Sequence, residues 1–500
     1  MADDNTQREY DGVLVNIVEY VYHFTPKSDK AWRKAKIALL DSIACAFESL
    51  QNEEARSLIG PYFPSKDKST GARLPGTDLA MDPMKVAFDF GSLIRFLDHN
   101  DAMGGMEWGH PSDNIGAILP IADWLDQVAE AAGKPRFKME TVLEALIKAY
   151  EVQGCLQQLN AFNKVGIDHT ILVRIASTAV VSWLLGNSEA QALSALSHAW
   201  MDGGPLRTFR QSPNTGPRKG WAAGDACMRA VQLCMIAGRG QPGAPTALSA
   251  PRWGFYDSIY KGSELLLKAA YGTFVVEHVF FKCFPVEGHA ASGAEAALVL
   301  SKKLRQLQTD PLSDIEQVKV RTQQAAMTII NKQGPLHNAA DRDHCMQYII
   351  AVILAKGEMI EVGDYQDSSV WAQDPRVESL RARIEMVEEP QFTQDYHAPT
   401  KRSVSTALTA VLKEGQNIEE VLVEYPMGHP FRKDTADAVK EKYAKLVTSC
   451  LGAGDKANKV NSLADVDLQT LREMEVSKFV DLLTLEKPLN GHLAAEDVGA

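Results

Sequence analysis

The stretch SVSTALTAVLKEGQNIEEVLVEYP, residues 403–426, decides the fold class, because it predicts two β-strands in a chain whose other patterns are mostly helical. Apolar and polar side chains alternate along it, which is the spacing of strands that are buried on one face. The positions expected on that face are Val404, Thr406, Leu408, Ala410, Leu412, Val421, Val423 and Tyr425. A turn centred on Gly415 separates the two expected strands.

Two shorter segments carry a similar pattern, DIEQVKVRT at residues 314–322 and RIEMV at residues 383–387. In the first of them Val318 is one step out of phase with Ile315. Helical segments alternate with these strands along the chain, and one of them, GAEAALVLSKKLRQL at residues 293–307, precedes the first strand. This part of the chain is therefore predicted to be an α+β region.

The flanking parts are helical. TVLEALIKAYEVQGCLQQL, residues 141–159, has one apolar stripe, and ASTAVVSWLL, residues 176–185, is apolar on most sides and belongs inside a helical array. Gly186 fits a helix end, and Ser188 with Gln191 fits a capping box at the next helix start. We predict a mainly α fold: a helical domain formed by residues 1–275 and 431–500, with an α+β domain, residues 276–430, inserted in it.

Composition excludes several functions. The 500 residues carry a formal net charge of -12, which argues against a general nucleic-acid or anionic-membrane role. No apolar run reaches the ~18 residues of a membrane span. The seven cysteines are scattered without a C-x-x-C pair, which favours reduced thiols inside a cell and argues against an iron–sulfur cluster or a thiolate zinc site.

The acidic N-terminus is neither a signal nor a transit peptide, so we expect a cytoplasmic protein, with the mitochondrial matrix as the alternative.

Titratable side chains gather in the loop FLDHNDAMGGMEWGHPSDNIGA, residues 96–117. Ser112 or Asp113 is expected to cap the helix that follows, which puts His110 just outside a helix N-terminus. The helix dipole there favours a neutral imidazole that accepts a proton, and Asp98 is a candidate to orient the ring. The alternative interpretation is a surface loop whose polar residues only cap the helix.

Four more loops are polar. NAFNKVGIDHTILVRIAST, residues 160–178, places His169 at a helix start. The loop at residues 201–226 is basic and suits carboxylate binding, unless it is simply a solvated surface loop. Its candidate residues are Arg207, Arg210, Arg218 and Lys219.

The last two loops lie in the α+β region. VFFKCFPVEGHAASGAEAAL, residues 279–298, supplies Lys282 and His289. GPLHNAADRDHCMQYIIAVILA, residues 334–355, is expected to place His344 and Tyr348 on one helix face, although Tyr348 also suits core packing. Together the five loops favour acid–base chemistry on a polyanionic small molecule, with no metal and no cofactor.

Long ordered segments resemble the MmgE/PrpD family over nearly the whole chain. They include LLDSIACAFESL, RFLDHNDAMGGMEWGHPSDNIGAILPIADWL, TGPRKGWAAGDA, FKCFPVEGHA, NAADRDHCMQYIIAVIL and VEYPMGHP. The resemblance implies a homodimer, a large helical domain, a smaller α+β lid domain, and an active site between the two. It also implies that the family's catalytic positions fall on Asp98, His110, His169, Lys282, His289 and Tyr348.

The family resemblance implies a cofactor-independent hydro-lyase that removes water from the tricarboxylate 2-methylcitrate to give 2-methyl-cis-aconitate, in the methylcitrate cycle of propionate breakdown. The alternative is the family's other branch, which decarboxylates cis-aconitate to itaconate. That branch has a lysine in the third loop that aligns near Thr215 here, whereas Arg218 and Lys219 lie downstream. This difference favours the dehydratase branch. No nucleic-acid or membrane partner is expected.

Overall fold

The computed structural model describes residues 8–63, 71–211, 213–268, 270–398 and 400–486. It is mainly helical with small sheets, as the sequence predicts. The chain divides into two compact units: residues 1–279 with 440–500 form the helical unit, and residues 280–439 form the sheet unit. Within the described residues, no helix combines the length and the apolar character needed to cross a membrane.

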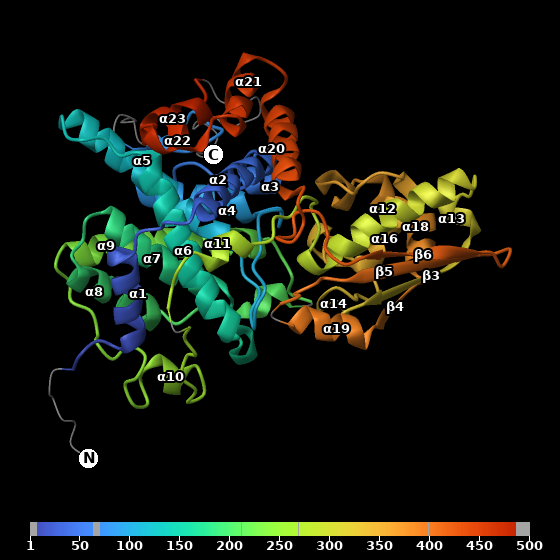
Figure 1. Ribbon diagram of the computed structural model, residues 1–500, viewed down its shortest axis with the longest axis horizontal. Helices are drawn as coiled ribbons and strands as arrows, with labels where there is room; N and C mark the ends of the chain where they lie inside the picture. The colour runs from blue at the N-terminus through green and yellow to red at the C-terminus, as the bar shows by residue number, and fades with distance from the viewer. Residues whose placement is uncertain (1–7, 64–70, 212, 269, 399, 487–500) are drawn as a thin grey trace. The chain divides into compact units, whose positions relative to one another are not determined.

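The helical unit contains the longer helices, seen in blue to green and in red in Figure 1. Its helices are α1 (Gly12–His23), α2 (Asp29–Ser49), α3 (Glu53–Arg56), α4 (Pro83–Arg95), α5 (Ile115–Ala131), α6 (Met139–Leu159), α7 (Thr170–Leu184), α8 (Glu189–Met201), α9 (Arg218–Gly238), α10 (Phe255–Ser258), α11 (Phe274–His278), α21 (Asp455–Asn461), α22 (Leu468–Glu473) and α23 (Val476–Leu483). Strands β1 (Ala72–Arg73) and β2 (Ala80–Met81) form a small antiparallel pair. Helix α20 (Thr435–Leu451) contains the point where the chain returns to this unit.

The core of the helical unit is built around α4, α5, α7 and α9. Helix α7 is buried along almost its whole length, as its apolar sequence predicts. Three glycines let the other helices approach closely: a Cβ on Gly91 would lie 2.9 Å from Cα of Gly224, and a Cβ on Gly116 would lie 2.5 Å from Cα of Gly91. Any side chain at these positions would push α4, α5 and α9 apart.

Local helix signals are largely confirmed. Gly186 is left-handed with φ of 71° after α7, and Ser188 with Gln191 forms the predicted capping box of α8. The predicted cap at residues 112–113 is wrong. Ser112 and Asp113 lie inside the 3₁₀ helix η1 (Pro111–Asn114) that precedes α5, and their side chains bond to the loop before it instead.

The sheet unit contains a four-stranded sheet of order β4-β3-β5-β6. Its elements are α12 (Ala291–Gln306), α13 (Pro311–Asp314), β3 (Ile315–Thr322), α14 (Gln324–Ile329), α15 (Ala339–Arg342), α16 (Met346–Lys356), α17 (Val370–Gln373), α18 (Pro375–Arg381), β4 (Ile384–Glu388), α19 (Pro390–His397), β5 (Thr406–Leu412) and β6 (Asn417–Val423). Strands β3 and β4 are parallel, while β5 is antiparallel to both β3 and β6. Helix α12 packs against β5 and β6, and α16 packs against β4.

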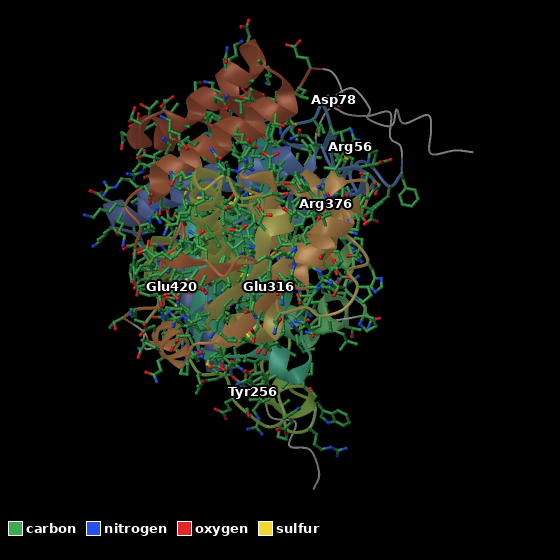
Figure 2. The ribbon with its side chains drawn as sticks, turned by 90° about the vertical axis from the view of Figure 1, so that its right-hand side faces the viewer. Arg56, Asp78, Tyr256, Glu316, Arg376 and Glu420 are labelled. Carbon is green, nitrogen blue, oxygen red and sulfur yellow. The ribbon has the colours of Figure 1, made fainter. Side chains whose placement is uncertain are left out.

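The predicted hairpin of residues 403–426 is confirmed, with Gly415 left-handed at its turn. The phase slip in the first strand has a structural cause, because the pairing of β3 with β5 shifts register between Ile315 and Gln317. This bulge lets Ile315 and Val318 both be buried. Charged side chains occupy the other face, where Arg321 Nη2 lies 2.8 Å from Oε1 of Glu420, which is labelled in Figure 2.

Candidate active site

Three loops of the helical unit come together through backbone and side-chain contacts. The loop after α4 passes close to the end of α6, where a Cβ on Gly105 would lie 2.5 Å from Cα of Gln158. Glu107 then accepts a 2.8 Å hydrogen bond from the Asn163 backbone N–H in the second loop. The second loop joins the third, because the Asp168 N–H donates to the Pro205 carbonyl at 2.9 Å. Residues far apart in sequence therefore share one region.

His110 is buried and held at both ring nitrogens. Its Nδ1 lies 2.6 Å from the backbone oxygen of Asp101, which accepts only, so Nδ1 carries the proton. Nε2 is then the acceptor, and Arg95 Nη2 donates to it at 3.0 Å. Asp98 does not orient the ring through a ring N–H in the predicted way. Its Oδ1 is 4.0 Å from Nε2, and it contacts Arg95 instead.

The backbone of Asp98 has φ of 54°, in the left-handed region that few residues other than glycine adopt. This turn follows α4 directly and puts the carboxylate next to Arg95 at the end of that helix. The anchoring role belongs to Asp101 instead, whose carboxylate accepts from Ser112 and from the Tyr150 hydroxyl, each at 2.6 Å. Burial raises the pKa of Asp101 to about 6.

His169 is the N-cap of α7 and so stands at a helix start, as predicted, and its ring centre is 5.5 Å from that of His110. Burial lowers the pKa of His169 well below its ordinary value; the charge of Asp168 opposes this, and the charges of Arg210, Arg207 and Arg95 add to it. The imidazole is therefore neutral at neutral pH. Its Nε2 is buried and has no hydrogen-bond partner among the residues that the structure describes.

The predicted basic loop supplies two arginines to this cluster. Arg210 Nη2 is 3.2 Å from Oδ1 of Asp168, and Arg207 Nη1 is 3.4 Å from Oδ2 of the same residue. Burial raises the pKa of Asp168, but Arg210 and its neighbours outweigh burial and hold it below the ordinary value. Asp168 is thus an ionised brace for both guanidinium groups.

The other two basic residues of this loop are at the start of α9. Lys219 is buried there. Arg218 stacks on Trp221, with its guanidinium carbon 4.2 Å from the ring centre, and its Nη2 is 3.9 Å from Asp225. Arg218 is therefore held by an aromatic ring, in contrast to Arg207 and Arg210.

Glu107 also belongs to this cluster. Its Oε1 is 3.5 Å from Arg207, and burial raises its pKa to about 7 in spite of that cation. Sequence reasoning missed Glu107 and Arg95. Arg95 looked like an ordinary basic residue in the last turn of a helix, and nothing in its local sequence indicates a partner fifteen residues later.

In the sheet unit, His289 is fully buried and lies between two partners. Its Nδ1 is 2.9 Å from Oε1 of Glu287, and its Nε2 is 3.1 Å from the Tyr396 hydroxyl. Lys282 is buried too. Burial raises the pKa of Glu287, but the charges of His289, His344 and Lys282 outweigh burial and hold it below the ordinary value.

Tyr348 is buried, and its hydroxyl donates to the Asp364 carbonyl at 2.7 Å, which fits the core-packing alternative. The expected helix face shared by His344 and Tyr348 is wrong, because α16 begins at Met346 and His344 precedes it. His344 Nδ1 instead contacts Oδ1 of Asp343. Sequence reasoning also missed Glu287 and Tyr396 as partners of His289.

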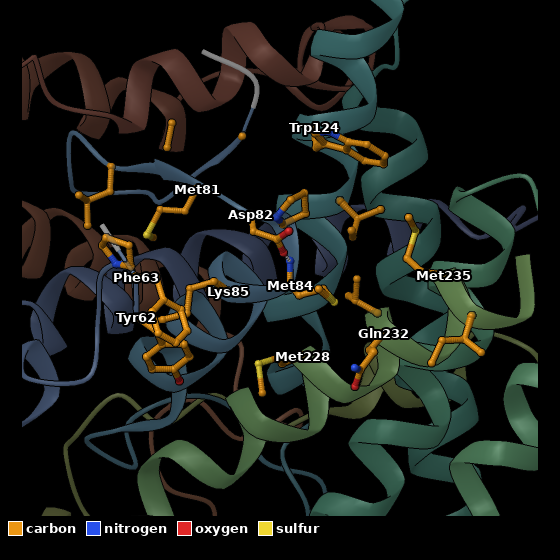
Figure 3. Close-up of a pocket in the computed structure, with 18 of the residues that line it drawn as sticks. Tyr62, Phe63, Met81, Asp82, Met84, Lys85, Trp124, Met228, Gln232 and Met235 are labelled. Atoms are coloured by element: carbon orange, nitrogen blue, oxygen red, sulfur yellow. Dashed lines mark hydrogen bonds between the residues drawn. The ribbon is translucent and has the colours of Figure 1, made fainter. Parts of the chain in front are cut away.

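A pocket of about 880 Å³ lies elsewhere in the helical unit, among residues of α4, α5 and α9 (Figure 3). Its walls are apolar and rich in methionine. They include Tyr62, Phe63, Met81, Met84, Lys85, Trp124, Met228, Gln232 and Met235. None of the site residues predicted from the sequence lines this pocket in the described part of the chain. Among the same residues, no three His, Cys, Asp or Glu side chains are gathered so that they could hold a metal ion.

Comparison with known proteins places these residues in a family. Residues 15–268 match the MmgE/PrpD N-terminal domain, and residues 284–468 match the MmgE/PrpD C-terminal domain. The chain is 51% identical to the 2-methylcitrate dehydratase-like protein oryR of Aspergillus oryzae, over 96% of this chain and 97% of that protein. It is 43% identical to the 2-methylcitrate dehydratase of Escherichia coli K12, over 96% and 99% of the two chains. It is 44% identical to the alkylcitrate dehydratase phiI of a fungal species, over 95% and 94%. The chain belongs to the MmgE/PrpD family.

Proposed function

We propose that this chain removes water from 2-methylcitrate to give 2-methyl-cis-aconitate, as a hydro-lyase of propionate breakdown. The observation that supports this most directly is the similarity to the Escherichia coli 2-methylcitrate dehydratase over 99% of that protein. The chemistry of the described residues agrees with it. An elimination of water needs a base for the proton α to a carboxylate, an acid for the departing hydroxyl, and cations for the carboxylates.

The base is His169. Its neutral ring offers a lone pair, and its Nε2 has no partner among the described residues, whereas Nε2 of His110 accepts from Arg95. The guanidinium groups that lower the pKa of His169 also attract a tricarboxylate to a protein whose net charge is negative. A bound carboxylate offsets part of their charge, so the basicity of His169 rises when substrate is present.

Arg207 and Arg210 hold the substrate carboxylates. Lys219 and Lys282 are further cations, and Arg218, which stacks on Trp221, is a peripheral one. Because Asp168 fixes two of these guanidinium groups, they are ordered before substrate binds, which reduces the entropy lost on binding. His289 supplies the proton for the leaving hydroxyl. Tyr348 is the weaker candidate for that acid, since its hydroxyl donates to a backbone carbonyl.

The test is an assay of purified protein with synthetic 2-methylcitrate, followed by ultraviolet absorbance of the new double bond. We expect turnover with 2-methylcitrate and slower turnover with citrate. No turnover of either compound would refute the proposed function. Dialysis against EDTA should leave the rate unchanged, and a loss of rate restored only by added metal would refute the metal-independent part.

A second candidate substrate is a citrate with a longer alkyl chain. It is favoured by one observation, that the alkylcitrate dehydratase phiI is as similar to this chain as the bacterial enzyme is. The ratio of kcat/KM for 2-methylcitrate and for 2-alkylcitrates of increasing length decides between the two. Decarboxylation of cis-aconitate is tested by searching the products for itaconate, which we do not expect, since none of the three relatives is named as a decarboxylase.

We also propose that the protein is a homodimer that acts in the cytoplasm, with the mitochondrial matrix as the alternative. The family resemblance supports the dimer. Light scattering of the eluted protein should give twice the chain mass of 54.9 kDa. Fluorescent tagging at the C-terminus, which leaves the N-terminus unaltered, tests the compartment.

A further inference from the structure

In the sheet unit, three polar side chains from two distant segments contact one another in a row. Glu287 and His289 belong to the turn around the 3₁₀ helix η4 (Gly288–Ala290), and Tyr396 lies 107 residues later in α19. Both carboxylate oxygens of Glu287 face the imidazole, with Nδ1 at 2.9 and 3.1 Å. The Tyr396 hydroxyl is 3.1 Å from Nε2 on the other side of the ring.

The acceptor next to His289 determines which nitrogen of the ring carries a proton. Glu287 is ionised because its pKa is below the ordinary value, so it can only accept, and Nδ1 of His289 donates to it. Glu287 also accepts the backbone N–H of His289 at 2.8 Å, which fixes the carboxylate relative to the ring. The nitrogen that exchanges a proton is therefore Nε2, and the Tyr396 hydroxyl lies within hydrogen-bond distance of it.

His289 and Tyr396 differ in their exposure to solvent. The His289 side chain is only 1% exposed, whereas Tyr396 is half-buried. Helix α19 is fixed in place near this point, because the Thr393 hydroxyl accepts from the Gln324 backbone N–H at 3.0 Å and contacts Glu388 at 2.9 Å. Tyr396 is thus held against His289 by contacts that do not involve the histidine itself.

We propose that Tyr396 carries the proton between His289 and the leaving hydroxyl of the substrate, and that Glu287 is the positioning residue behind them. This inference rests on the proposed function. The Tyr396 O–H bond breaks as its proton joins the departing hydroxyl to form water, and Nε2–H of His289 passes its proton to the phenol oxygen. In this step the ring starts with a proton on both nitrogens and ends with one on Nδ1 alone, which Glu287 holds, and solvent then reprotonates Nε2 through the Tyr396 hydroxyl.

The experiment compares kcat and KM for 2-methylcitrate in four variants: Tyr396→Phe, Glu287→Gln, His289→Asn and the double variant His289→Asn/Tyr396→Phe. The control is Tyr22→Phe, because Tyr22 is also a half-buried tyrosine whose hydroxyl donates to a backbone carbonyl, that of Asn187 at 2.8 Å in the other unit. We expect Tyr396→Phe to lower kcat by about 100-fold with KM changed by less than about threefold, as for the loss of a general acid. The control should retain the wild-type kcat.

Two further readouts exclude a merely structural role. Residues that act in one relay are not additive, so the double variant should be no slower than His289→Asn alone. In Glu287→Gln the ring loses its counter-charge, so the limb of the kcat profile that reports the acid should move to lower pH.

Other outcomes would overturn the inference. It fails if Tyr396→Phe keeps a kcat within twofold of the wild type, or if the losses of the two single variants multiply in the double variant. Should Tyr396→Phe not fold, an unchanged pH profile in Glu287→Gln overturns it equally. An inactive wild type would instead refute the proposed function, so the two failures are distinguishable.

Discussion

Histidines in the two units lie in different electrostatic surroundings. In the helical unit, burial holds the pKa of His169 well below the ordinary value, and the charges of Arg210, Arg207 and Arg95 lower it while that of Asp168 raises it. In the sheet unit, His289 lies against the ionised carboxylate of Glu287. In our proposal the histidine beside the arginines accepts a proton, and the histidine beside Glu287 passes one on. This contrast is the physical basis of our proposal that His169 is the base and that His289 supplies the proton of the acid.

The largest expected effect comes from removing the base. His169→Asn should lower kcat by about 10³-fold, within the range for a general base, and leave the circular dichroism spectrum unchanged. His110→Asn should lower it less, since His110 accepts from Arg95 and is not the base in our assignment. If His110→Asn is the slower variant, the two roles are exchanged.

The ion pair of Asp168 with the arginines should contribute more to the free energy of unfolding than an exposed ion pair does. Asp168→Asn removes the charge of the buried carboxylate that two guanidinium groups share, so we expect a loss of about 3 kcal/mol in urea unfolding at pH 7. Asp168 has a depressed pKa, so its contribution is present above the unfolded pKa of about 4 and is lost as the pH falls below that value. The difference in unfolding free energy between the wild type and Asp168→Asn should therefore become smaller below about pH 4. A difference that is constant from pH 7 to pH 3 would contradict this.

A smaller effect should come from the charge next to His110. Arg95→Met removes one of the cations that lower the pKa of His169, so that pKa should rise and the acidic limb of the kcat/KM profile should move to higher pH. The shift should be modest, because burial is the main cause of the low pKa. Arg95→Lys, which keeps the charge, is the matched control and should leave the limb near its wild-type position.

The smallest effect is expected at the exposed face of the sheet. Arg321 and Glu420 form an ion pair in which both side chains are about one-third exposed. Glu420→Gln should change the stability by less than about 1 kcal/mol, and added salt should reduce the effect further. A loss as large as that of Asp168→Asn would show that burial does not explain the difference between the two pairs.

Sequence patterns predicted the parts of this structure that depend on neighbours along the chain. The period of residues 403–426, the capping box at Ser188 and the helix start at His169 are local features, and all three are present. The cap at residues 112–113 failed, because a buried tertiary partner, Asp101, competes for the Ser112 side chain.

The partners of the candidate site residues could not be read from local patterns. Arg95 meets His110 through a loop, and Tyr396 meets His289 across more than one hundred residues. The loops themselves could be found, since they are dense in titratable groups. What the pattern lacks is the pairing that decides which nitrogen carries a proton, and therefore which group acts as acid or base.

Under the proposed mechanism, the glycine crossing of α4, α5 and α9 makes catalysis sensitive to a single methyl group at a distance from the chemistry. Gly91 lies one helical turn before Arg95, and Gly116 follows His110 by six residues, so this contact sets the separation of the guanidinium from the imidazole. Alanine at either position would act as a spacer that moves the two groups apart, and a displacement of about 1 Å is enough to cost a large part of the rate. Natural variation at these glycines would then be limited by turnover rather than by folding alone.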